Sequence, residues 1–194
     1  MSGCVRRVKS VWLKRENDSV QVRMAPVEKE RQMTESTTIE MVSQHVASEE
    51  LAARTYRFLA SWCGVNGYDG SEAFFLAESA DETRHMVEWQ AYTIDRWEDT
   101  TPPPIGEQPG IDHEITRLCD AYELALALEK SVLQQINQIG RSAMSEGDVD
   151  VLRFLGPYAS VGISSIRDLT SVVQQLDQLD DSHVVLWDLK RMEG

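Results

Sequence analysis

The stretch FFLAESADETRHMVEWQAY, residues 74–92, decides the fold. It contains no proline or glycine, and a repeat of three or four residues connects Phe75, Glu78, Glu82, His85, Trp89 and Tyr92. Residues at this spacing lie on one face of an α-helix. The stretch therefore predicts a long helix whose packing face carries carboxylates and an imidazole among aromatic rings.

Three other segments carry the same repeat and predict three more long helices. They begin near Thr38, near Thr116 and after Asp148, and the last of them ends near Leu179. A short apolar piece, residues 184–192, follows and predicts a fifth helix. Helices with packing faces of this period cross at a shallow angle, as in a four-helix bundle. The predicted fold class is all-α.

Two of the helix starts carry their own sequence signals. Thr37 with Glu40 forms a capping-box pattern before the first long segment, and Asp69 with Glu72 gives a similar signal before the second. In a capping box each of the two side chains accepts a hydrogen bond from a backbone N–H of the first turn. Both helices are therefore expected to be capped by residues close in sequence.

The lengths of the connections predict the topology. The glycine-rich turn at residues 64–70 and the break at residues 145–148 are short, so they join antiparallel neighbours. The link of residues 99–115, by contrast, is rich in proline and reaches roughly 55 Å when extended. A helix of about 28 residues is about 42 Å long. The link can therefore cross the whole bundle, and one long crossover between two hairpins is the ferritin-like arrangement.

Composition and charge exclude several classes of protein. The 194 residues carry a net charge of −13, so binding to nucleic acid is disfavoured by phosphate repulsion. The sequence contains no run of 18 apolar residues, so no membrane span is expected. The three cysteines, Cys4, Cys63 and Cys119, form no close pair, which is typical of a reducing compartment and predicts a cytoplasmic protein.

The charge is distributed unevenly along the chain. Residues 1–32 carry eight basic and four acidic side chains, whereas the remainder carries 11 basic and 28 acidic ones. The chain is therefore divided into a basic extension, residues 1–35, and a bundle domain, residues 36–194. The extension is expected to be disordered. A targeting role, or translation from an upstream start codon, are the alternatives for it.

Four ionisable side chains lie on the predicted packing faces at one level of the bundle, namely Glu49, Glu82, His85 and Glu129. A buried carboxylate is unfavourable unless it is paired or bound to a metal, and no lysine or arginine shares these faces. Glutamate oxygens with one imidazole suit Fe²⁺, Mn²⁺ or Zn²⁺. The pattern therefore predicts a metal site. The other histidines, His45, His113 and His183, lack such a pattern and are expected at the surface.

Several stretches of the body resemble the bacterial non-haem ferritins. They are Glu49 followed by Tyr56, Ser61-Trp62-Cys63, Glu82-Thr83-Arg84-His85-Met86, Leu128-Glu129-Lys130, Ser142-Ala143-Met144 and the terminal Val185-Leu186-Trp187-Asp188. The resemblance covers about residues 36–191. It implies a four-helix bundle with a short fifth helix, and 24 such subunits that build a hollow shell. It also implies oxidation of Fe²⁺ by O₂ or peroxide at a di-iron ferroxidase centre, with ferric mineral stored inside.

The same resemblance assigns roles to individual residues. Glu49 and His85 would bind the first iron, Glu82 would bridge two irons, and Glu129 would bind the second. Tyr56 would lie beside the centre as an electron donor and hydrogen-bond partner.

The fourth long segment departs from the family. Where the family places glutamine or glutamate ligands, this chain has Gly162 and Ser165, and the nearest acid is Asp168. The second iron position is therefore expected to be incomplete, and a third position would keep Asp81 alone. The small side chains would leave room for water, admit a bulky neighbour or let two helices approach closely.

Three functions are compatible with this pattern. The first is an iron-storage subunit with ferroxidase activity that assembles into a shell. The second is a shell-forming subunit with a degenerate, inactive centre. The third is a small ferritin-like metal oxidase that forms no shell.

Overall fold

The computed structural model describes residues 37–100 and 115–191. Within these ranges the chain is helical and contains no strand, and its helices are α1 (Thr38–Val65), α2 (Asp69–Trp97), α3 (Leu118–Glu146), α4 (Val149–Leu176) and α5 (Asp181–Lys190). The prediction of an all-α fold is confirmed. None of the helices in the described ranges is long and apolar enough to cross a bilayer. The chain divides into the units Met1–Glu35 and Ser36–Gly194. The predicted disordered extension lies outside the described residues.

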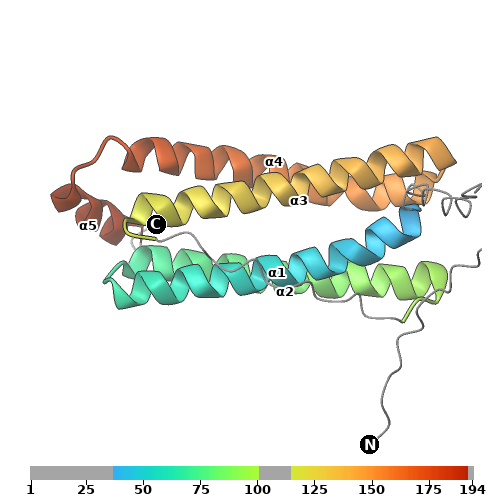
Figure 1. The fold of residues 1–194 in the computed structure, drawn as a ribbon, viewed down its shortest axis with the longest axis horizontal. Helices are drawn as coiled ribbons and strands as arrows, with labels where there is room; N and C mark the ends of the chain where they lie inside the picture. The colour runs from blue at the N-terminus through green and yellow to red at the C-terminus, as the bar shows by residue number, and fades with distance from the viewer. Residues whose placement is uncertain (1–36, 101–114, 192–194) are drawn as a thin grey trace, which may run out of the picture. The chain divides into compact units, whose positions relative to one another are not determined.

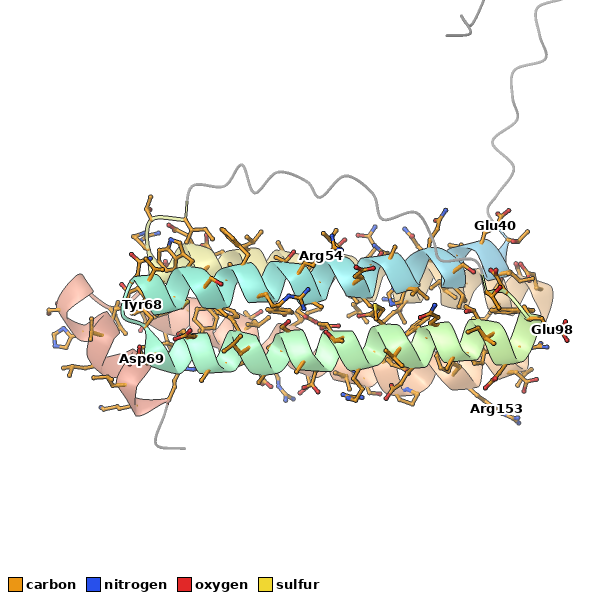
Figure 2. All side chains as sticks on the ribbon, turned by 90° about the horizontal axis from the view of Figure 1, so that it is seen from below. Glu40, Arg54, Tyr68, Asp69, Glu98 and Arg153 are labelled. Atoms are coloured by element: carbon orange, nitrogen blue, oxygen red, sulfur yellow. The ribbon has the colours of Figure 1, made fainter. Side chains whose placement is uncertain are left out.

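The four long helices form two antiparallel hairpins, α1 with α2 and α3 with α4 (Figure 1). The end of α2 and the start of α3 lie at opposite ends of the bundle, which is the arrangement of helices that the ferritin-like topology requires (Figure 1). The short α5 lies across the end where α1 turns into α2. Tyr68 and Asp69, which are labelled in Figure 2, mark where this turn ends and α2 begins.

The two helix starts that carried sequence signals have different outcomes. The side chain of Thr37 accepts from the backbone N–H of Glu40 and Glu40 accepts from that of Thr37, so the predicted capping box is present. The prediction for α2 is wrong, because its N-cap residue is Tyr68 and makes no side-chain cap. The carboxylate of Asp188 on α5 instead accepts from the backbone N–H groups of Gly70 and Ser71, at 2.9 and 2.8 Å.

The apolar core consists of two clusters separated along the bundle axis. The cluster near α5 includes Tyr56, Phe75, Tyr122 and Leu169. The cluster at the other end is formed by the residues Val42, Val46, Trp89, Val132, Ile136, Ile139, Ala143, Val151 and Leu155. On each of α1, α2 and α3 a buried glutamate follows one cluster and precedes the other, and these glutamates are Glu49, Glu82 and Glu129. The packing thus leaves a polar layer in the middle of the bundle.

Candidate metal centre

The structure brings three of the predicted ligands into contact distance. Ligand atoms of Glu49, Glu82 and His85 all lie within 4.8 Å of one another. His85 presents Nδ1 toward Glu82, with Nδ1 3.3 Å from Oε2, because residues three apart share a helix face. Glu49 and Glu82 are 1% and 5% exposed, while His85 is half-buried. The three side chains from α1 and α2 therefore converge in the polar layer.

Glu129 reaches the same layer from α3 and is held by Tyr56. The hydroxyl of Tyr56 donates a hydrogen bond to Oε1 of Glu129 over 2.5 Å. Burial, followed by the charge of Glu129, raises the pKa of Tyr56, so this hydroxyl keeps its proton. Tyr56 thus positions a carboxylate that lies outside the tightest group of three ligands.

Burial dominates the electrostatics of the carboxyls in the layer. Burial raises the pKa of Glu49, and it raises the pKa values of Glu82 and Glu129 to about 7. Burial opposes the charging of His85, but its hydrogen bond with Glu82 and the charges of Glu82 and Glu49 raise its pKa overall. In the described part of the chain, no lysine or arginine forms an ion pair with any of these three glutamates.

This donor set fits a divalent cation. Oε2 of Glu49 is fully buried and has no hydrogen-bond partner, so it is free to bind an ion. Carboxylate oxygens and one imidazole nitrogen match the preferences of Fe²⁺, Mn²⁺ and Zn²⁺. A bound cation would replace the protons that the raised pKa values place on these carboxyls.

His45 belongs to this layer, and its predicted surface position is wrong. The side chain is 1% exposed, and its ring stacks at a tilt on Trp89 with centroids 4.0 Å apart. Burial lowers its pKa to about 4, so the ring is neutral. Its position four residues before Glu49 on α1 is the sequence signal that could have revealed it, because that spacing shares a helix face.

The hydrogen-bond geometry of His45 links it to Glu49. Nδ1 lies 3.1 Å from Oε1 of Gln135, an acceptor, which places the ring proton on Nδ1. Nε2 lies 2.7 Å from Oε1 of Glu49, outside hydrogen-bonding geometry. The neutral imidazole of His45 thus lies beside a carboxyl whose pKa is raised by burial.

Glu78 is a further carboxyl near the layer. It lies one turn before Glu82 on α2 and is half-buried. Burial and then the charges of Glu129 and Glu82 raise its pKa to about 7. Glu78 belongs to the helical repeat of residues 74–92. That repeat also includes residues that only pack in the core, so it did not identify Glu78 as part of the centre.

The fourth helix supplies no carboxylate to the layer. Gly162 is buried, and a Cβ at this position would meet Cδ1 of Leu133 at 3.4 Å. Gly162 therefore faces the side chain of Leu133 on α3, with which a Cβ would be in ordinary van der Waals contact. Asp168 is exposed and pairs with Arg167, and Asp81 is exposed and pairs with Arg84 at 3.1 Å.

Comparisons with known proteins agree with this architecture. The family model of the ferritin-like domain matches residues 39–179. A bacterial non-heme ferritin of Escherichia coli O6:H1 is 22% identical over 148 residues, which cover 74% of this chain and 86% of that protein. One of Campylobacter jejuni is 23% identical over 128 residues, which cover 66% of this chain and 75% of that protein.

Solved structures share the fold at similarly low identity. The apo-ferritin from Pseudo-nitzschia multiseries has a TM-score of 0.68 at 21% identity, over 71% of this chain and 86% of that one. An iron-soaked PmFTN variant has a TM-score of 0.74 at 19% identity, over 78% of this chain and 97% of that one. With the family match covering most of the helical body, the chain belongs to the ferritin-like domain family.

Proposed function

We propose that this protein is an iron-storage subunit that oxidises Fe²⁺ at the layer formed by Glu49, Glu82, His85 and Glu129. The observation that carries the proposal is a set of three buried glutamates with raised pKa values and, among the described residues, no lysine or arginine partner. Fe²⁺ is the substrate, and each ion gives one electron to O₂ or peroxide. The ferric product is stored as mineral inside a shell of 24 subunits.

The four residues would bind two iron ions. Glu49 and His85 bind the first ion, and Glu82, which lies beside both, also serves the second. Glu129 binds the second ion, and its carboxylate is positioned by the hydrogen bond that the Tyr56 hydroxyl donates to Oε1. Because α4 adds no carboxylate, the second ion has fewer protein ligands than the first and is the weaker of the two. Binding releases the protons that the metal-free carboxyls hold near neutral pH.

The test is the initial rate of aerobic Fe²⁺ oxidation at about two ions per subunit. His85→Ala is expected to lower the rate at least about tenfold, because even the removal of an outer partner of a metal ligand has effects of that size. His183→Ala is the matched control, since His183 is exposed on α5 and pairs only with Asp180. A wild-type rate equal to that of free Fe²⁺ would favour the shell-forming subunit with an inactive centre. A particle of one or two subunits would favour the small oxidase.

A further inference from the structure

A pocket of about 390 Å³ lies between α2 of one hairpin and α4 of the other. Its volume is in the range of pockets that bind small molecules. The residues that matter here are Arg84, His85 and Glu88 from α2 and Arg153, Phe154 and Tyr158 from α4. His85 is thus common to the pocket and to the metal layer. Figure 2 shows Arg153 on the outside of the bundle, at the end where α2 finishes with Glu98.

Two arginines line the pocket on a strongly acidic body, and each of them is paired with an aspartate. Arg84 and Arg153 line it together with a single carboxylate, that of Glu88. Both oxygens of that carboxylate are already engaged, since Oε2 accepts from the Tyr158 hydroxyl at 2.8 Å and Oε1 from Arg84 at 3.1 Å. The body as a whole, residues 33–194, carries 17 more acidic than basic side chains. On this otherwise acidic surface, guanidinium groups are what the pocket offers to an anion.

The arginines retain donors for a ligand. Arg153 pairs with Asp150 at 3.6 Å, and both side chains are more than 60% exposed, so this pair is weak and easily exchanged. Arg84 contacts Asp81 and Glu88, but a guanidinium has five N–H donors and is not exhausted by two carboxylates. Arginine pairs well with carboxylate because its planar fork offers two parallel hydrogen bonds.

His85 also lines the pocket, and its Nε2 would become a donor there when Nδ1 binds a metal. Its Nε2 lies 3.3 Å from a terminal nitrogen of Arg84, which can only donate. If the proposed function holds and Nδ1 binds a metal, the ring proton moves to Nε2 and needs an acceptor. Metal-binding histidines usually find one in a carboxylate, a carbonyl or water. An anion between Arg84 and His85 would accept from both side chains.

The remaining walls are apolar. Phe154, Pro157 and Val161 line the α4 side, and the ring of Tyr158 meets His85 edge-on with centroids 5.4 Å apart. Inorganic phosphate would leave these apolar walls in contact with water. A ligand with a hydrocarbon body would cover them, and burial of apolar surface is favourable by about 25 cal/mol per Å².

We propose that the α2–α4 pocket binds a small organic carboxylate beside the metal layer. The carboxylate group faces Arg84, Arg153 and Nε2 of His85, and its apolar body lies against Phe154 and Val161. The ligand would thus supply, from outside the chain, an acidic group next to the helix that lacks the family's carboxylates. Occupancy of the pocket would then modulate how tightly the centre holds metal.

The test is calorimetric titration of the metal-free full-length protein with benzoate. Saturable binding is expected, and Arg153→Gln is expected to weaken it about tenfold. Arg167→Gln is the matched control, because Arg167 is also exposed on α4 and also pairs with a neighbouring aspartate, but lies outside the pocket. Absence of saturable binding, or equal weakening by both substitutions, would overturn the proposal.

Two further ligands test the chemistry of the pocket. Benzamidine has the same ring with a positive charge, and inorganic phosphate has the charge without the ring. Both are expected to bind at least about tenfold more weakly than benzoate. Tighter binding of benzamidine would refute the role of the arginines, and tighter binding of phosphate would refute the role of the apolar walls.

A second titration separates this proposal from the proposed function. With Zn²⁺ bound, benzoate should bind more tightly to the wild-type protein, and by linkage Zn²⁺ should bind more tightly in the presence of benzoate. Benzoate binding by the metal-free protein, with no Zn²⁺ binding at all, would overturn the metal centre and leave the pocket supported. Zn²⁺ binding without benzoate binding would overturn the pocket alone.

Discussion

At the scale of single residues, the α4 side of the proposed centre is where a carboxylate ligand is missing. Ser165 is half-buried on α4, one turn after Gly162. A Cβ at residue 162 would meet Cδ1 of Leu133 at 3.4 Å, whereas Ser165 already carries a side chain at a half-buried position. We therefore expect a carboxylate to be restored most easily at residue 165.

Ser165→Glu is expected to strengthen binding of the second divalent ion about tenfold, or ~1.4 kcal/mol. The reason is that the new carboxylate adds a ligand opposite Glu129, where α4 supplies none. Titration with Co²⁺ under anaerobic conditions measures both sites. Ser164→Glu is the control, because Ser164 contacts Asp168 and Arg167 instead. An equal effect of both variants would mean that general negative charge, and not ligation, is responsible.

The buried carboxyls also predict how stability depends on pH. The folded-state pKa values of Glu78, Glu82 and Glu129 are about 7, against ordinary values of 4.5. Between these values the folded state binds more protons than the unfolded state, so the free energy of unfolding falls as pH rises. His85, whose pKa is also raised, acts in the same direction. His45 opposes them, because its pKa is lowered from 6.5 to about 4 and its contribution is lost as pH falls.

The metal-free protein is therefore expected to lose several degrees of Tm between about pH 5 and pH 7.5. Thermal unfolding in the presence of EDTA measures this, and Zn²⁺ should restore the Tm at the higher pH. Glu82→Gln, which removes one of the titrating groups, should flatten the profile. A Tm that rises over this interval would show that the layer is not a group of protonated carboxyls.

Sequence reasoning placed the four proposed ligands correctly at one level, because helical rise and the turn positions determine depth along a bundle. It missed the burial of His45, because the side chain that hydrogen-bonds its ring, Gln135, lies 90 residues away along the chain. It also left three explanations for the small residues of α4 and did not reveal that Leu133 faces Gly162. Side-chain volume on a facing helix is not visible in a periodic pattern.

At the scale of elements, α5 is held by a buried carboxylate. Asp188 is 1% exposed and accepts hydrogen bonds from the backbone of Gly70 and Ser71 and from the Ser71 hydroxyl. A carboxylate at a helix N-terminus is favourable because of the free N–H groups and the helix dipole. Arg191 adds a cation–π contact with Phe74 at 4.8 Å.

This arrangement explains why α2 has no cap of its own. The signal from Asp69 and Glu72 failed because a residue 118 positions away along the chain supplies the acceptor. The box at Thr37 succeeded because both of its partners are local. Capping can be predicted from sequence only when the cap and the helix are neighbours in the chain.

Asp188→Asn is expected to lower the free energy of unfolding by about 2 kcal/mol and to release α5. Tryptic cleavage after Lys190 should become faster, and urea unfolding should report the loss of stability. Asp95→Asn is the control, as Asp95 is an exposed carboxylate on the same helix that Asp188 caps. Gly70→Ala should release α5 by another route, because the added Cβ would collide with the backbone oxygen of Asp188. Unchanged cleavage in both variants would show that α5 is held by its apolar contacts.

At the scale of the whole molecule, α5 has a second face that the bundle does not cover. Val185, Leu186 and Leu189 are 45%, 57% and 45% exposed, while Asp188 between them is buried. Apolar side chains gathered in this way on one helix mark a contact with another protein more often than a free surface. Under the proposed shell, other copies of this chain would cover them.

Leu186→Glu is therefore expected to reduce the assembly without unfolding the subunit, because it places a charge in an apolar contact that must lose its water. Sedimentation velocity should show the wild-type protein near 24 times the 22.0 kDa of the chain and the variant as much smaller species. Ser182→Glu introduces the same side chain at the exposed start of α5, where the helix dipole favours it, and should leave the particle intact. A wild-type particle of one or two subunits would contradict the shell at once. A full-sized particle in the Leu186→Glu variant would show that the contacts between subunits lie on the long helices, and that the apolar face of α5 is not what joins them.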